Sequence, residues 1–130
     1  MILIDSSAWI EFLRDTRSPV CERVDELLGG DIATCEPVRM EILAGARDER
    51  HLGDLRGLLA SATLLSTVPT DFEEAASLYR VCRQRGETPR KLVDCLIASI
   101  AIRHGVCVLH CDTDFEVLAR HTQLAIYRPE

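Results

Sequence analysis

Four acidic residues of this 130-residue chain occur where a folded protein usually places apolar side chains. Asp5 and Asp112 each follow a short apolar run, whereas Glu41 and Asp94 each interrupt an apolar pattern with helical spacing. Carboxylates rarely enter apolar surroundings unless another charge compensates them. If the four side chains converge, they form a site for hard cations that prefer oxygen ligands, such as Mg²⁺ or Mn²⁺. The chemistry expected of that site is metal-assisted hydrolysis of a phosphodiester.

Each of these acids, taken alone, also fits a structural role. Asp5 could cap a following helix, Glu41 could lie on the exposed side of a helix, and Asp112 could be a turn residue. Asp94 could lie on a polar helix face, in the early turns where the positive end of the helix dipole stabilises a carboxylate. Only the combination of the four favours a metal site.

Charge balance explains why a nuclease would need four carboxylates. Mg²⁺ prefers near-octahedral oxygen ligands and keeps several waters. Two such ions about 3.5–4 Å apart can stabilise both the attacking and the leaving oxygen of a phosphodiester. Four carboxylates offset two divalent ions, and without metal their mutual repulsion raises some of their pKa values. No histidine or lysine base is required, because a metal ion makes its bound water more acidic.

The elements that must position these acids alternate between short apolar strands and helices. A helix around residues 9–13 is expected to have Ser7 as its N-cap. Strands are expected at residues 2–5, 32–35, 64–65, 106–109 and 124–126, and further helices at residues 19–28, 36–47, 49–60, 71–85, 88–104 and 113–121. This alternation predicts a parallel sheet covered on both faces. Since ligands bind beyond the carboxyl ends of such strands, Asp5 and Asp112 should share one rim.

Length and composition agree with one domain spanning residues 1–130. The apolar fraction of 47% suits a globular core. No apolar stretch approaches the roughly 18 residues of a membrane span, and no export signal is visible, so a cytoplasmic protein is expected. For such a protein the six cysteines favour reduced thiols over disulfides or a metal site.

The net charge of −6 argues mildly against a broad basic surface for nucleic acid. Residues 80–104 reverse the overall balance, with six basic residues against Glu87 and Asp94. That segment could form a local basic lip, and it is equally compatible with a solvated helix face.

Four segments together resemble the PIN-domain ribonucleases, specifically the VapC toxins of type II toxin–antitoxin pairs. They are Ile4–Trp9, Glu36–Gly45, Leu92–Ser99 and His110–Phe115, each containing one of the four acids. Each motif is weak alone, whereas four in this order within one short chain are specific. The first motif carries Ser6 where the family more often has threonine, which keeps the hydroxyl.

The resemblance implies a three-layer α/β/α sandwich with a short parallel sheet. It also implies endonucleolytic cleavage of RNA that depends on Mg²⁺ or Mn²⁺, inhibition by a VapB-type antitoxin, and commonly a homodimer. By motif position, Asp5, Glu41, Asp94 and Asp112 carry over as the catalytic, metal-binding acids. Asp114 is a fifth acid of the last motif, which could bind metal directly, through water or not at all.

Each polar residue near the acids could have a functional or a purely structural role. Ser7 could hydrogen-bond a metal-bound water or the scissile phosphate, or it could only cap its helix. Arg90, together with Lys91, could hold phosphate beside the cut, or it could belong to a solvated helix start. His110 is more often a structural residue at a strand end than a catalytic one.

An apolar stripe near the N-terminus consists of Trp9, Phe12 and Leu13. Core packing explains such a stripe. The alternative is that part of it lines a groove for a helix of the antitoxin.

The leading hypothesis is therefore a metal-dependent RNase toxin. A PIN-like nuclease of RNA processing or DNA repair without an antitoxin is the second hypothesis, which the small size of the chain disfavours. A non-catalytic module of the same fold would be expected to lack part of the acidic set. A phosphatase-like or receiver domain would need a pair of acids after the first strand and a lysine after a late strand, and neither occurs.

Overall fold

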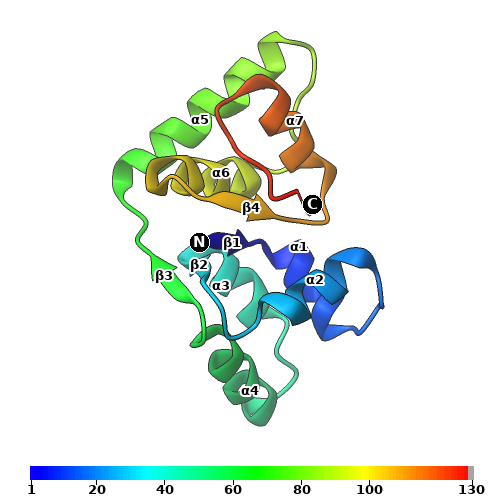
Figure 1. The fold of residues 1–130 in the computed structure, drawn as a ribbon. Helices are drawn as coiled ribbons and strands as arrows, with labels where there is room; N and C mark the ends of the chain where they lie inside the picture. The colour runs from blue at the N-terminus through cyan, green and yellow to red at the C-terminus, as the bar shows by residue number, and fades with distance from the viewer. Residues whose placement is uncertain (129–130) are drawn as a thin grey trace.

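A parallel sheet forms the centre of the computed structural model, which describes residues 1–128 (Figure 1). Its four strands pair in the order β3 (Thr63–Leu65), β2 (Ile32–Cys35), β1 (Ile2–Ile4) and β4 (Cys107–Leu109). All neighbouring strands are parallel. Every residue of β2 is buried, as expected for an inner strand of a sheet covered on both faces.

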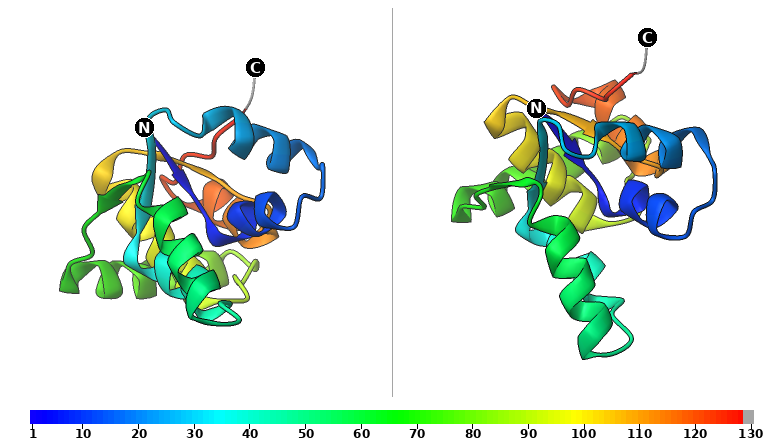
Figure 2. Two further views of the ribbon diagram at one scale, coloured as in Figure 1. Left: turned by 90° about the horizontal axis from the view of Figure 1, so that it is seen from below. Right: turned by 60° about the horizontal axis from the view of Figure 1, so that its bottom comes forward.

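Seven helices lie within the described residues, and they form two layers. Helices α1 (Ser6–Leu13), α2 (Pro19–Leu27), α3 (Glu36–Ala44) and α4 (Glu49–Leu59) follow β1 and β2. Helices α5 (Pro69–Gln84), α6 (Leu92–His104) and α7 (Thr113–His121) follow β3 and β4. Figure 1 shows α5, α6 and α7 together above the sheet and the other four below it, and Figure 2 shows the same arrangement from two further directions. The predicted α/β/α fold is therefore confirmed.

The fifth expected strand, at residues 124–126, is wrong as an element. Only Ile126 pairs with β4, through a single parallel bridge to Val108. Val108 donates its N–H to the carbonyl of Ala125 at 3.0 Å, and Tyr127 donates to the carbonyl of Val108 at 2.9 Å. With β4 only three residues long, one bridge is all the pairing that this segment makes.

Two helix starts also differ from the sequence predictions. The N-cap of α1 is Asp5 rather than Ser7, because the Asp5 carboxylate accepts the Ser7 N–H at 2.9 Å. Helix α6 begins at Leu92 rather than near residue 88. The N–H groups of Arg90 and Lys91 point instead at the carboxylate of Asp114, which holds this segment as a loop.

Helix α6 is the most buried helix of the fold. From Asp94 to Ala101 all side chains except that of Leu96 are buried, because α5, α7, α3 and β4 all pack against this helix. A helix packed on all sides is apolar all round, which explains its lack of an amphipathic pattern. It ends at Gly105, whose φ of +67° is the left-handed conformation that glycine adopts readily. The carboxylate of Asp94, in the buried part of α6, is thus forced into the interior.

The six cysteines carry free thiols, and Cys21, Cys35, Cys82 and Cys95 are buried. Burial raises the pKa of Cys35 and of Cys95 to about 12, so both thiols stay protonated and unreactive.

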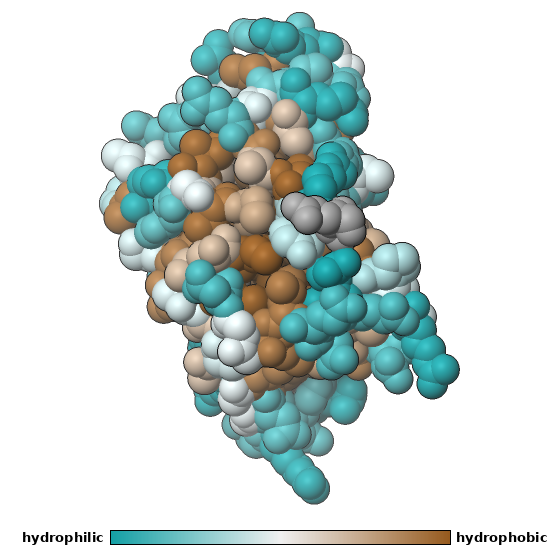
Figure 3. All heavy atoms as spheres, viewed as in Figure 1, coloured by the Kyte–Doolittle hydropathy of each residue, from teal (hydrophilic) through white to brown (hydrophobic). Residues whose placement is uncertain are grey.

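No helix of the described chain is long and apolar enough to cross a membrane. On the face shown in Figure 3, hydrophobic residues gather in the middle and hydrophilic residues cover the two ends.

Candidate metal centre

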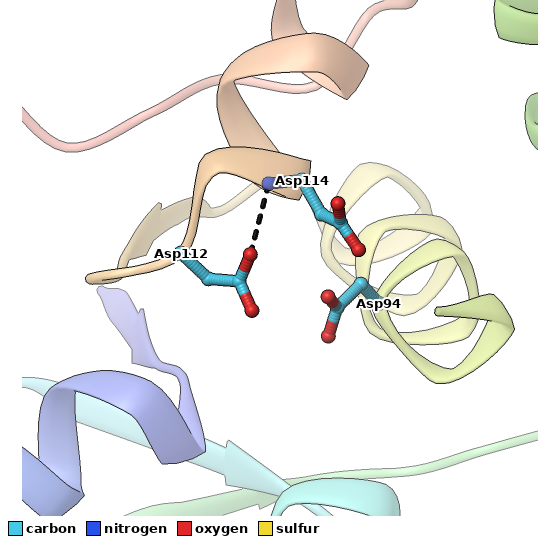
Figure 4. A group of neighbouring side chains, drawn as sticks. All are labelled: Asp94, Asp112 and Asp114. Atoms are coloured by element: carbon cyan, nitrogen blue, oxygen red, sulfur yellow. Dashed lines mark hydrogen bonds between the residues drawn. The ribbon is translucent and has the colours of Figure 1, made fainter. Parts of the chain in front are cut away.

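Three carboxylates meet beyond the carboxyl ends of β1 and β4. Asp94 on α6, Asp112 at the start of α7 and Asp114 in its first turn offer oxygens that all lie within 4.8 Å of one another (Figure 4). The backbone N–H of Asp5, at the end of β1, donates to the carbonyl of Leu109 at the end of β4 at 3.0 Å. Adjacent parallel strands therefore bring Asp5 to the same rim, as the sequence predicted.

Asp94 is the most perturbed of these acids. Its side chain is 2% exposed, and its Oδ2 makes no hydrogen bond with any described residue. Lys91 Nζ lies 3.8 Å from that oxygen, which is within ion-pair range but too long for a hydrogen bond. Burial, followed by the neighbouring carboxylates of Asp114 and Asp5, raises the pKa of Asp94 to about 8. A bound divalent cation would relieve this cost directly.

The negative charge of Asp112 is already balanced by hydrogen-bond donors and two cationic side chains. Its carboxylate accepts hydrogen bonds from the Asp114 N–H at 2.9 Å, from Arg90 at 3.0 Å and from Lys91 Nζ at 2.9 Å. Burial opposes ionisation of this group, but the donors together outweigh it, so the pKa of Asp112 lies below its ordinary value. Asp112 is therefore an ionised carboxylate near neutral pH.

Asp114 serves the backbone of the loop before α6. Its carboxylate accepts the N–H groups of Arg90 and Lys91, each at 3.0 Å, and the Arg90 Nε lies 3.4 Å away. This arrangement places two cationic side chains beside the acidic cluster. The role of Asp114 that the structure shows is to hold this loop, in addition to any contact with metal.

Two further acids contribute charge to this group. Asp5 is 2% exposed; its Oδ2 accepts from Ser7, whereas Oδ1 has no hydrogen-bond partner within residues 1–128. Burial raises the pKa of Asp5. Glu41 accepts the hydroxyl of Ser6 at 2.9 Å, and burial followed by the charge of Asp5 raises its pKa. Neither belongs to the group of oxygens within 4.8 Å of one another, but the charge of Asp5 acts on Asp94 and the charges of Glu41 and Asp112 act on each other.

The residues present fit a hard divalent cation. Two buried carboxylate oxygens, Asp5 Oδ1 and Asp94 Oδ2, lack a donor, although buried polar atoms are normally paired. Carboxylate oxygens are the ligands that Mg²⁺ and Mn²⁺ prefer. The acidic cluster can therefore bind a metal ion.

Two serines orient the carboxylates. Ser7 Oγ donates to Asp5 Oδ2 at 2.6 Å and accepts the N–H of Cys111 at 2.9 Å, which ties the end of β1 to the loop after β4. Its hydroxyl is thus engaged by protein atoms. Sequence reasoning missed the role of Ser6 as the partner of Glu41, although the first motif marks Ser6 as a position that keeps a hydroxyl.

The apolar stripe of α1 divides between the core and two hollows. Trp9 is completely buried, so its assignment as a direct antitoxin contact is wrong in this structure; its ring packs edge-to-face on Phe12 at 6.3 Å between centroids. Phe12 lines a cavity of about 730 Å³ between α1 and α2. Leu13, 42% exposed, lines a groove of about 370 Å³ between α1, α3 and α4. Glu41 also lines that groove, which therefore borders the acidic site.

Comparison with known proteins agrees with this geometry. Residues 2–121 match the PIN domain model. The chain is 47% identical over 128 residues to ribonuclease VapC11 of Mycobacterium tuberculosis (strain H37Rv), covering 95% of this chain and 96% of the relative. It is equally similar to VapC ribonuclease Mb1587 of Mycobacterium bovis. The chain thus belongs to the PIN-domain family and, within it, to the VapC ribonucleases, as its motifs predicted.

Solved structures share the fold at low identity. VapBC2 from Rickettsia felis, bound to a promoter DNA fragment, superposes with a TM-score of 0.78 at 17% identity and covers all of both chains. VapBC-1 from nontypeable Haemophilus influenzae gives 0.76 at 18% identity, covering 98% of this chain and 97% of that one.

The raised pKa of Asp94 predicts a pH-dependent stability. Asp94 binds its proton more tightly in the folded state, where its pKa is about 8, than in the unfolded state, where it is 3.8. Its contribution to the free energy of unfolding is therefore fully present below pH 3.8 and is lost as the pH rises through about 8. In EDTA, the melting temperature of Asp94→Asn relative to wild type should therefore increase from pH 5 to pH 8. Saturating Mn²⁺ should stabilise wild type more than the variant. The exposed Asp54→Asn is the control, and a pH-independent difference between Asp94→Asn and wild type would contradict the assignment.

Proposed function

We propose that this VapC ribonuclease cuts RNA endonucleolytically with Mg²⁺ or Mn²⁺ bound at Asp5, Glu41, Asp94 and Asp112, and that residues 1–130 form one cytoplasmic PIN domain. The observation that carries the proposal is the pair of buried carboxylate oxygens without donors at the edge of an acidic cluster. Nearly equal length and 47% identity to VapC ribonucleases disfavour a processing nuclease without an antitoxin.

The bound ion would supply Lewis-acid stabilisation of phosphate charge and a more acidic water. Asp5 and Asp94 would hold it through their free oxygens, with Asp112, Glu41 and Asp114 completing the acidic set. Ser7 keeps Asp5 in one orientation through the 2.6 Å hydrogen bond. Arg90 is the substrate-binding candidate: its side chain is 68% exposed and sits over Asp112 and Asp114, where it can turn to a phosphate oxygen.

Metal dependence should be complete. EDTA should abolish cleavage of total cellular RNA, and added Mg²⁺ or Mn²⁺ should restore it, because the acidic cluster cannot attract phosphate without a cation. Asp5→Asn and Asp94→Asn should each lower the cleavage rate at least about 100-fold. Sequencing of the new 5′ ends measures cleavage and reads out its position. Full activity in excess chelator would refute the mechanism, and wild-type rates in either variant would show that the site lies elsewhere.

A VapB-type antitoxin is the expected partner. The structures that share this fold include VapBC complexes, and a nuclease that cuts cellular RNA must be restrained in its own cell. The groove between α1, α3 and α4 is suited to an apolar segment through Leu13, Ile10 and Leu55. Arg14 and Arg47 line the same groove, and Glu41 borders the acidic site, where a basic side chain of the partner could compete with metal.

Substitution should identify the groove. Co-expression with the product of the adjacent reading frame should give an inhibited complex. Leu13→Glu should weaken it at least about tenfold, because it puts a charge into the apolar contact. Phe12→Glu probes the cavity on the other side of α1, and Leu64→Glu on β3 is an exposed control. If Leu13→Glu is inhibited as tightly as wild type, the partner does not use this groove.

A homodimer is expected from the family, and an apolar surface supports it. Met40 on α3, Phe72 on α5 and Leu92 on α6 are 61%, 58% and 61% exposed. They border two adjoining hollows that share Phe72 and Leu96. Exposed apolar side chains gathered in this way are typical of an interface.

Oligomeric state tests this surface. Phe72→Glu should shift the protein from dimer to monomer in light scattering after size exclusion, because a charge at the centre of an isologous contact is buried twice. Leu64→Glu, at a residue that is 53% exposed but lies outside the surface, should leave the dimer intact. A wild-type monomer at all concentrations would refute the proposal.

A further inference from the structure

His110 follows strand β4 directly and contacts the backbone of a metal-site residue. Its Nδ1 lies 3.1 Å from the backbone nitrogen of Asp112. A backbone N–H can only donate, so this Nδ1 carries no proton and the ring holds its proton on Nε2. That Nε2 lies 3.4 Å from Glu116 Oε1. The ring therefore has a defined tautomer, with one nitrogen accepting from the site and the other directed away from it.

The ring is held on several sides. The His110 side chain is 8% exposed, and its ring lies against Phe115 with 5.2 Å between centroids. Glu116 is itself fixed by two hydrogen bonds from Arg128, at 3.0 and 2.9 Å. A chain of contacts thus runs from Arg128 through Glu116 and His110 to the backbone of Asp112.

The backbone of Asp112 is held at its carbonyl, which accepts the N–H of Phe115 at 3.2 Å. It lies between β4 and α7, in a segment without regular structure. Its carboxylate caps α7 through the Asp114 N–H. The backbone N–H of Asp112 donates to the His110 ring, and this hydrogen bond fixes the plane of the peptide between Cys111 and Asp112. Loss of the His110 acceptor would therefore release the N–H end of Asp112 and leave its carboxylate oriented only by the Asp114 N–H, Arg90 and Lys91.

We propose that His110 is a positioning residue of the metal centre, and that its Nδ1 fixes the Asp112 carboxylate for metal binding by accepting the Asp112 N–H. The inference rests on the proposed function, because it assumes that Asp112 is a ligand. Groups that orient metal ligands typically change metal affinity about 10–100-fold when they are removed. The competing explanation is that His110 only fills space against Phe115. Only the positioning role requires a hydrogen-bond acceptor at the place of Nδ1 for full metal affinity.

Two amide substitutions separate these explanations. In His110→Asn the side-chain oxygen can occupy the place of Nδ1, whereas in His110→Gln the amide extends to the place of Nε2. Mn²⁺ affinity is measured from the electron paramagnetic resonance signal of the free ion. We expect Asn to bind Mn²⁺ within about threefold of wild type and Gln to bind at least about tenfold more weakly. The amide proton resonance of Asp112 should stay near its wild-type shift in the Asn variant only.

Melting temperatures supply the structural control. A space-filling role predicts that Mn²⁺ affinity falls in proportion to stability in both variants. Equal affinities of the Asn and Gln variants, or losses that follow the melting temperature, would overturn the inference. Glu116→Gln retains an oxygen for the Nε2–H and should bind Mn²⁺ like wild type. If wild type binds no Mn²⁺, or if Asp94→Asn binds it equally well, the proposed metal centre fails and this inference fails with it.

Discussion

Burial of several carboxylates at one edge of a parallel sheet is the constraint on which the rest of this structure depends. Asp94 lies in the buried central part of α6, and Asp5 directly follows the inner strand β1, so neither side chain reaches bulk water. Burying a carboxylate without a counter-charge is expensive. Burial accordingly raises the pKa of Asp94 to about 8 and raises the pKa of Asp5. A bound divalent cation would remove the cost of burying these carboxylates by supplying positive charge, so that they need not be protonated.

The loop before α6 supplies the counter-charge that the protein itself carries. Asp114 holds this loop by its N–H groups, and the loop in turn directs Arg90 and Lys91 at Asp112. The carboxylate of Asp114 thus binds the backbone N–H groups of the loop, and this places the side chains of Arg90 and Lys91 against the carboxylate of Asp112. The result is an ionised Asp112 beside Asp94, one of whose buried oxygens has no hydrogen-bond donor among the described residues.

Neutral groups set the directions of the acids without neutralising them. Ser6 holds Glu41 and Ser7 holds Asp5, while His110 accepts the N–H of Asp112. Each partner leaves oxygen lone pairs of the carboxylate free for another ligand. Hydrogen bonds of this kind orient a charge at little cost to its affinity for a cation, which suits a site built on short strand ends.

The sequence by itself determined the fold class and the family and predicted which acids form the site, because short apolar runs and four spaced motifs are local features of the chain. It also located the four strands and most helices. Tertiary structure alone decided which groups meet. Trp9 belongs to the core rather than to a docking surface, residues 124–126 reduce to one bridge, and residues 88–91 form a loop held by Asp114. Each of these outcomes depends on partners more than fifteen residues away or on packing from another layer, and local propensity carries no information about either.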